Sequence, residues 1–204
     1  MTYSNGKVAG VLFFIAASQF VLGLIVSEAL YSGYSISSNY ISDLGVGPSS
    51  SIFNSSVFLL GLLLIIGTYF LQRAFKEYKV LTLTLILTAI GAMGVGVFTE
   101  NFGTIHSVVS LIAFLFGGLS AIFSVVSSFT RKFKLVKTPF SFIAAILGVM
   151  CLGALVLFTA KIDLGLGVGG IERMIVYPIL MWAAGFGGYL MAHPQTGTTE
   201  QKPQ

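Results

Sequence analysis

The sequence predicts an all-α, polytopic membrane protein: a single bundle of six transmembrane helices with both termini in the cytoplasm. Two observations support this fold class. The 204 residues are 55% hydrophobic and only 9% charged, with a mean hydropathy of +0.94, far outside the range of soluble globular domains. Six apolar stretches are also long enough to cross a hydrocarbon core, which takes about 20 residues of helix.

The six predicted spans follow one another through short connections, so one compact bundle is expected rather than two domains. They cover residues 8–30, 51–71, 80–98, 106–129, 139–160 and 171–191. Lys7 is the only charged residue before the first span, and no small-residue cleavage site follows the span. We therefore interpret this span as a retained helix rather than a signal peptide. The polar tail, residues 192–204, is predicted to be disordered in the cytoplasm.

The basic residues set the predicted orientation. Nine of the 11 Lys and Arg residues lie before the first span, after the second and fourth spans, or in the tail, whereas five of the seven Asp and Glu residues lie in the other connections or at the span ends next to them. Short loops rich in Lys and Arg stay in the cytoplasm, so the acidic connections are predicted to face outward. We expect the cell membrane as the location and membrane lipids as partners. Anionic headgroups explain the basic clusters better than nucleic acid, whose binding is not expected.

Polar residues extend the packing faces of the predicted spans. Small residues at intervals of three or four mark where membrane helices approach one another, and in the fourth span this stripe leads outward to His106. A similar stripe leads to Glu100 beyond the third span, and another runs through Met181 and Tyr177 to Arg173 in the sixth. Gln19 in the first span is expected to donate an interhelical hydrogen bond. Polar groups of five helices are thus predicted to converge near the outer surface, where we expect a pocket.

The loop after the first span supplies the residue types of a hydrolytic site. Ser42 offers a hydroxyl nucleophile, His106 a base, and Asp43 or Glu100 an orienting carboxylate. Two plainer interpretations stay open: Ser42 as the cap of a short helix or turn, and His106 as an interfacial histidine bonded to a loop carbonyl. The candidate catalytic residues are Ser42, Asp43, Glu100 and His106, and the candidate substrate-binding residues are Asn39, Asn54, Arg173 and Tyr177.

A glycine-rich loop, residues 165–170, directly precedes the sixth span. Such a turn can cradle an anion with its backbone amides, although chain flexibility explains it more often. It lacks the strand and the lysine of nucleotide-binding loops. Glu172 is expected to complement the dipole at this helix start. Pro178 is predicted to bend the helix, because it removes one amide donor.

The same residues carry a resemblance to a known family. Taken together they resemble the prokaryotic membrane-protein family catalogued as domain of unknown function 998, over nearly the whole chain apart from both tails. The resemblance implies a six-helix integral membrane protein and no particular activity. Its most specific part is the Ser-Asp-Leu-Gly element at 42–45. The residues that carry it are Asn39 to Gly45, Phe53, Asn54, Gly96 to Glu100, His106, Glu172, Arg173, Tyr177 and Pro178.

In residue types the chain is also similar to the membrane hydrolases that include alkaline ceramidases, which use Ser, Asp and several His around zinc. This chain departs from them, because its two histidines, His106 and His193, are predicted on opposite sides of the membrane. That excludes a three-histidine zinc site within one chain, and bis-histidine haem short of dimerisation. No metal and no cofactor are expected. The oligomeric state stays open, a homo-oligomer included.

Three functions from different classes fit the sequence. The first is an outer-leaflet hydrolase or binding site for a lipid or lipid-linked substrate, with Arg173 holding a phosphate or carboxylate. The second is a transporter for a small solute or protons, with Gln19 on its path. The third is a structural or accessory subunit in which Glu100 and Arg173 form an ion pair that locks the helices together. The inner halves of the spans are nearly all apolar, which favours a site at the outer surface.

Overall fold

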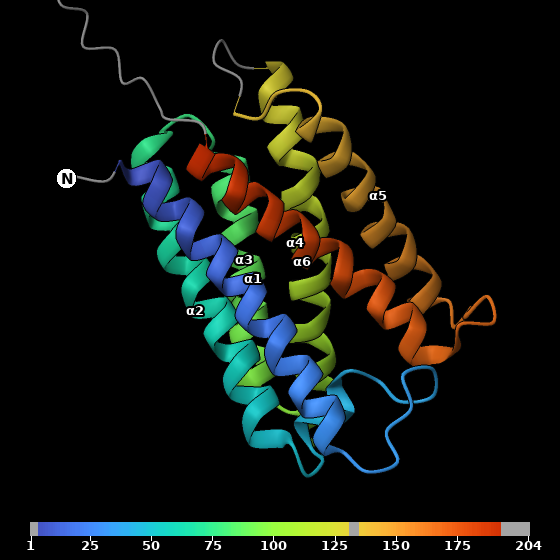
Figure 1. Ribbon diagram of the computed structural model, residues 1–204. Helices are drawn as coiled ribbons and strands as arrows, with labels where there is room; N and C mark the ends of the chain where they lie inside the picture. The colour runs from blue at the N-terminus through green and yellow to red at the C-terminus, as the bar shows by residue number, and fades with distance from the viewer. Residues whose placement is uncertain (1–3, 131–134, 193–204) are drawn as a thin grey trace, which may run out of the picture.

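The computed structural model describes residues 4–130 and 135–192, and six helices make up most of this part of the chain (Figure 1). In order they are α1 (Asn5–Leu30), α2 (Ser50–Ala74), α3 (Lys79–Val97), α4 (Thr104–Thr130), α5 (Phe140–Thr159) and α6 (Gly167–Ala192). All six are long and apolar enough to cross a membrane, and no strand occurs among the described residues. The predicted all-α, six-helix multi-pass membrane fold is therefore confirmed.

The connections at one end of the bundle contain two short 3-10 helices. These are η1 (Ser42–Gly45), which precedes α2, and η2 (Glu100–Phe102), which precedes α4. Gly103 ends η2 with a φ of 55°, a left-handed conformation that glycine adopts without steric strain. Both short helices lie at the same end of the bundle, and they contact each other.

The sixth helix begins earlier than predicted. α6 starts at Gly167, so the prediction of a loop over residues 165–170 is wrong from Gly167 onward. The helix can extend this far because its first turn packs against the backbone of the loop after α1, as described below. Pro178 lies inside α6 without ending it, and the predicted bend at this proline stays a prediction.

The helices form a ring. Each helix packs against the next one in sequence, and α6 closes the ring by packing against α1. α6 also contacts α4 directly, so α5 lies against both of them at the edge of the bundle (Figure 1). The closure is tight where α1 crosses α6, because a Cβ on Gly10 would lie 2.6 Å from the Gly187 carbonyl oxygen. Phe13 and Phe186 stack beside this crossing with ring centroids 5.7 Å apart.

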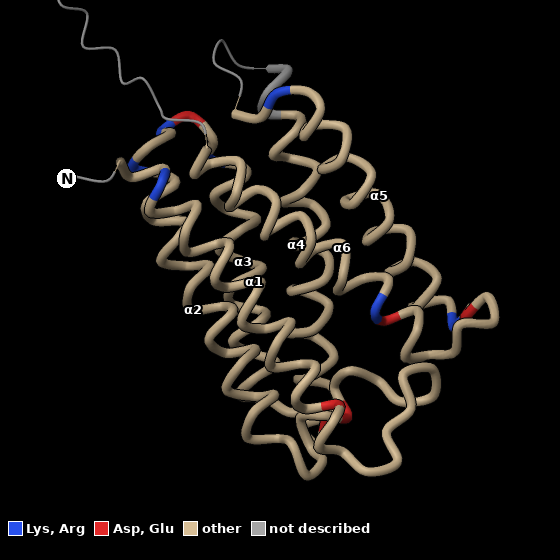
Figure 2. The backbone as a smooth tube through the Cα atoms, viewed as in Figure 1, with Lys and Arg blue, Asp and Glu red and all other residues tan. Residues whose placement is uncertain are grey.

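Charged residues divide between the two ends of the ring (Figure 2). At the basic end, which includes the start of α1 and the end of α6, lie Lys7, Arg73, Lys76, Glu77, Lys79 and Lys137. At the acidic end lie Glu28, Asp43, Glu100, Lys161, Asp163, Glu172 and Arg173. The location of the basic end in the cytoplasm stays a prediction. His193, Lys202 and most of the predicted tail, together with Arg131, Lys132 and Lys134, lie outside the described residues.

Candidate functional site

A cavity of about 80 Å³ lies inside the ring of helices. One water molecule needs about 10–15 Å³ of such space, so the cavity has room for at least about five water-sized groups. Five of the six helices contribute to its wall, and most of the wall is apolar. The lining includes Phe20 on α1, Leu64 on α2, Ala92 on α3, Ala113 on α4 and Leu180 on α6.

All the polar residues of the cavity except Thr88 on α3 gather at its acidic end. Ser42 in η1, Glu172 on α6, and His106 and Ser110 on α4 line this end, which we call the cavity mouth. Along α6 the lining runs from Glu172 to Ala183, roughly 16 Å at 1.5 Å per residue. This is about half the thickness of a hydrocarbon core. The cavity is therefore a slot with one polar and one apolar end.

His106 is buried and held in one orientation. Its Nδ1 lies 2.8 Å from the Phe98 carbonyl oxygen, and its Nε2 lies 3.3 Å from the Ser110 hydroxyl. A carbonyl only accepts hydrogen bonds, so Nδ1 carries a proton, and in the neutral ring Nε2 accepts one from Ser110. The interpretation of His106 as a histidine bonded to a loop carbonyl is thus confirmed. Ser42 lines the same cavity but makes no side-chain hydrogen bond within the described part of the chain.

The two candidate carboxylates, Asp43 and Glu100, lie beside each other rather than on His106. Asp43 accepts hydrogen bonds from the Asn39 side-chain amide at 2.8 Å and from the Tyr40 backbone N–H at 3.0 Å, which fixes the turn before η1. Partial burial of Glu100, together with its hydrogen bond to Asp43, raises the pKa of Glu100 to about 7. Neither carboxylate orients the imidazole, so the predicted Ser-His-carboxylate relay is not assembled in this structure.

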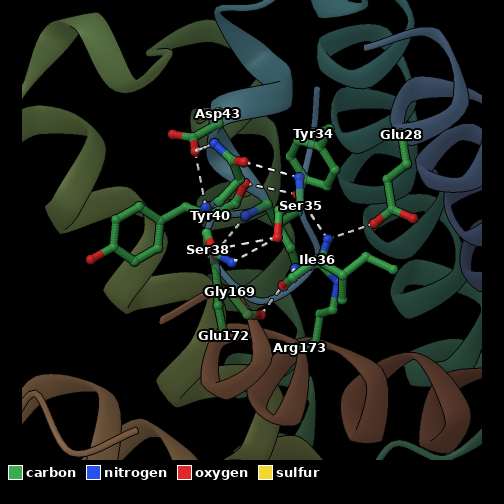
Figure 3. Close-up of polar contacts among 12 residues, drawn as sticks. Glu28, Tyr34, Ser35, Ile36, Ser38, Tyr40, Asp43, Gly169, Glu172 and Arg173 are labelled. Atoms are coloured by element: carbon green, nitrogen blue, oxygen red, sulfur yellow. Dashed lines mark hydrogen bonds and ion pairs between the residues drawn. The ribbon is translucent and has the colours of Figure 1, made fainter. Parts of the chain in front are cut away.

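Arg173 is the centre of a separate network, which we call the arginine clamp (Figure 3). Its Nη2 donates to the Glu28 carboxylate at 2.6 Å and to the Tyr34 hydroxyl at 2.8 Å. Its Nη1 donates at 3.0 Å to the carbonyl oxygens of Ile36 and Gly169. The prediction of an ion pair between Arg173 and Glu100 is therefore wrong, because Glu28 takes that place.

The clamp leaves Arg173 little capacity for a ligand. All four of its terminal N–H groups are used, and only 4% of the residue is exposed. Its Nε atom is buried without a hydrogen-bond partner. The guanidinium also lies over the Tyr34 ring, 5.6 Å from its centroid. Burial raises the pKa of Tyr34 to about 12, so its hydroxyl stays protonated.

The residue next to Arg173 faces the cavity instead. Glu172 is only 5% exposed, and one of its carboxylate oxygens accepts a hydrogen bond from the Ile41 backbone N–H at 2.5 Å. Successive residues on a helix point about 100° apart, which explains why Arg173 reaches the loop while Glu172 reaches the cavity. Sequence reasoning assigned Glu172 only to the helix dipole, and it did not find Glu28 at all.

The face of α6 that lines the cavity differs from the predicted one. The inward stripe is Glu172, Val176, Leu180 and Ala183. The predicted stripe ran through Tyr177 and Met181, but Met181 is 61% exposed and Tyr177 does not line the cavity. The spacing of Glu172, Val176 and Leu180 could have predicted the true face, because residues four and eight positions apart lie on one side of a helix.

The other predicted residues hold elements together outside the cavity. Asn39 accepts a hydrogen bond from the Ser35 backbone N–H at 3.0 Å. Asn54 donates to the Gly45 carbonyl oxygen at 2.9 Å, which ties η1 to α2. Gln19 donates to the Ser56 carbonyl oxygen at 3.0 Å, so the predicted interhelical hydrogen bond is confirmed. Roles for these residues in binding a substrate stay predictions.

The glycine-rich start of α6 contacts the loop that follows α1. The Gly169 backbone N–H donates to the Ser37 carbonyl oxygen at 3.0 Å. A Cβ on Gly169 would collide with the Asn39 carbonyl oxygen, and one on Gly167 with the Ser37 carbonyl oxygen. These glycines therefore allow the backbones of α6 and of the loop to approach closely. Among the described residues, no three His, Cys, Asp or Glu side chains gather as a metal site would require.

A family model described as a protein of unknown function, DUF998, matches residues 14–189. This range includes both the cavity mouth and the arginine clamp. No curated protein matches the chain, and no solved structure matches it. Because the family model covers most of the sequence, the expected family is confirmed: the chain belongs to the DUF998 family of proteins of unknown function.

Proposed function

We propose that the protein binds a membrane amphiphile, with its apolar chain in the cavity and its polar head at the cavity mouth. The observation that supports this most directly is the one-ended polarity of the slot: Ser42, His106 and Glu172 lie at its acidic end, and apolar side chains form nearly all of the remainder. A membrane lipid has the same division between a polar head and an apolar chain.

The energetics favour this orientation. Burial of each CH₂ group contributes about 0.8 kcal/mol, so a chain of about five groups in the slot would contribute about 4 kcal/mol. A polar head placed deeper would lose its hydration without finding partners, at a cost of roughly 1–3 kcal/mol or more. At the mouth, the same head meets hydroxyls, an imidazole and a carboxyl group.

The arrangement supports binding over transport. A path for a small solute or for protons would need polar groups along the inner half of the bundle. Thr88 is the polar residue deeper in the cavity lining, and its hydroxyl donates a hydrogen bond to the Thr84 carbonyl oxygen at 2.8 Å. Gln19, predicted to lie on such a path, is bonded to Ser56 instead.

Hydrolysis of the bound amphiphile is a second candidate, and the geometry of His106 favours it. The hydrogen bond to Phe98 places the basic Nε2 next to the Ser110 hydroxyl at the cavity mouth. That nitrogen is the atom that would take a proton from a hydroxyl or a water. Decanoyl esters of a chromogenic phenol test this directly: turnover is expected in the wild type and lost in His106→Ala, and an inactive wild type removes the hydrolase candidate.

Trp182 provides an internal reporter for binding. It is the single tryptophan of the chain, it is 2% exposed, and it precedes the cavity-lining Ala183 on α6. In phosphatidylcholine nanodiscs, 10-bromo-1-decanol in the cavity should quench Trp182 fluorescence, and 1-decanol should reverse the quenching by competition.

Cavity-filling variants distinguish the cavity from the bilayer. Ala92→Leu and Ala113→Leu place extra methyl groups into the slot from α3 and α4, so each should weaken quenching at least tenfold. Ala29→Leu, a matched change at an exposed position of α1, should leave it unchanged. Equal quenching in all four proteins would show that bromine reaches Trp182 only from the bilayer, and the proposed function would then be wrong.

A further inference from the structure

We infer that the amphiphile carries a primary amine head, and that Glu172 is its anionic partner. This inference rests on the proposed function, because it names the chemical class of the head that binds at the cavity mouth. It departs from the sequence-based expectation of a phosphate or carboxylate held by Arg173. The reason lies in which charges at the acidic end are already neutralised and which are not.

The positive charge nearest the cavity is already paired with a carboxylate. Arg173 donates all four terminal N–H groups to the clamp, and Glu28 neutralises it. Lys161, the other cation described at this end, is exposed in the connection after α5 and does not line the cavity. An anionic head at the mouth would therefore meet no available cation in the described part of the chain.

The negative charge at the mouth is not neutralised in the same way. Glu172 lines the cavity, and Arg173, Asp43 and Glu100 all lie within electrostatic range of it, but the charge of Arg173 is already paired with Glu28. None of these three carboxyl groups forms an ion pair with a described cation. A carboxylate can accept about four hydrogen bonds, yet Glu172 accepts one, from Ile41. The second oxygen of Glu172 makes no hydrogen bond with any described residue.

A primary ammonium group complements this arrangement. It is a compact cation with three donors and no acceptor. Glu172 can take one donor, and the Ser42 hydroxyl, which has no partner among the described residues, can take another. Keeping a buried carboxylate charged without a counter-ion costs free energy. A cationic head supplies that counter-ion, so its binding is favoured at a carboxylate that has none. A carboxylate head would face like charge from Glu172 and is disfavoured for that reason.

Four ligands with the same ten-carbon chain separate head chemistry from chain burial. Decylamine, decyltrimethylammonium, 1-decanol and decanoate each compete with 10-bromo-1-decanol for quenching of Trp182 in uncharged phosphatidylcholine nanodiscs at pH 7. Affinities are expressed per amphiphile dissolved in the bilayer, which removes differences in partitioning. We expect decylamine to bind at least tenfold more tightly than 1-decanol, decyltrimethylammonium to fall between them for lack of N–H donors, and decanoate to bind most weakly.

Glu172→Gln tests the partner. Its side-chain oxygen can still accept the hydrogen bond from Ile41, so the loop anchor is kept while the charge is removed. The variant should remove the preference for the amine, so that decylamine binds no more tightly than 1-decanol to the same variant. Asp163→Asn, an exposed acid at the same end of the bundle but outside the cavity, should leave the preference for the amine intact.

The outcomes separate the two proposals. If 1-decanol binds in the cavity but decylamine binds no more tightly, or if Glu172→Gln keeps the preference for the amine, the inference about the head is wrong and the proposed function stands. If no ligand produces quenching that Ala113→Leu weakens, the proposed function fails. Should Glu172→Gln not fold, the order of the four affinities in the wild type still decides the inference.

Discussion

Two neighbouring charged residues on α6 differ in how many hydrogen-bonding partners the fold gives them. Arg173 is buried in the arginine clamp, where Glu28, Tyr34 and two carbonyl oxygens use its terminal N–H groups. Glu172 is equally buried but accepts one hydrogen bond and lines the cavity. Burial of a charge is therefore a poor guide to function by itself. The unused hydrogen-bonding capacity of Glu172 is the reason we propose it as a binding residue, in contrast to the structural Arg173.

The comparison predicts the largest loss of stability at the clamp. Arg173→Gln should lower the free energy of unfolding by about 3 kcal/mol or more, because it leaves the Glu28 carboxylate without its ion pair. Thermal unfolding in detergent, followed by circular dichroism, measures the change. Lys161→Gln, which removes an exposed cation at the same end, should unfold like the wild type. An Arg173→Gln protein as stable as that control would break the distinction between clamp and mouth.

The next effect tests the close approach of α6 to the loop after α1. Gly169→Ala should cost about 1–3 kcal/mol, because its Cβ would collide with the Asn39 carbonyl oxygen and push apart the two backbones that the clamp joins. Gly153→Ala on α5, where a Cβ meets nothing within 4 Å, is the matched control and should be neutral or stabilising. Equal melting temperatures for the two variants would mean that the loop is not held by this contact.

A smaller effect is expected from one hydroxyl of the clamp. Tyr34→Phe removes the acceptor for Arg173 and the donor to the Tyr40 carbonyl oxygen, at a cost of about 1 kcal/mol. Tyr69→Phe removes an exposed hydroxyl at the basic end and should cost less. Denaturant titrations of the two variants sharpen the comparison by measuring how much each hydrogen bond of the clamp contributes. A larger loss of stability in Tyr69→Phe than in Tyr34→Phe would contradict this prediction.

The smallest effect is a dependence of stability on pH. The pKa of Glu100 is raised to about 7 in the folded protein, above its ordinary value near 4.3. The folded state then binds more protons between these two values, so the contribution of Glu100 to stability is greatest at low pH and is lost as pH rises through 7. Melting temperatures from pH 5 to 8 should fall less steeply in Glu100→Gln than in the wild type. Asp163→Asn serves as the control, and identical slopes in Glu100→Gln and wild type would contradict the assignment.

The sequence predicted the helices well because membrane spans are a matter of length and apolar composition. It also placed His106 correctly: the small-residue stripe of α4 leads from Ala113 through Ser110 to His106, and all three line the cavity. On this helix the small residues leave space, and the polar residues continue the same face to the mouth.

The same reasoning failed on α6. Its lipid-facing side is as apolar as its inner side, so hydropathy could not tell the exposed Met181 from the cavity-lining Leu180. Arg173 is covered by the loop that follows α1, and the periodicity of α6 contains no information about contacts with that loop. The pairing with Glu28, which lies 145 residues earlier, likewise depends on the closure of the ring by α1 and α6.

The most direct test of the cavity is the position of one heavy atom. Crystals grown with 10-bromo-1-decanol and measured at the bromine absorption edge locate the end of the chain without reference to its affinity. We predict an anomalous peak inside the ring near Leu64 and Ala183, with the alcohol oxygen toward Ser42 and Glu172. Bromine found only on the outer surface of the helices, in crystals saturated with the ligand, would contradict the proposal that this slot binds an amphiphile.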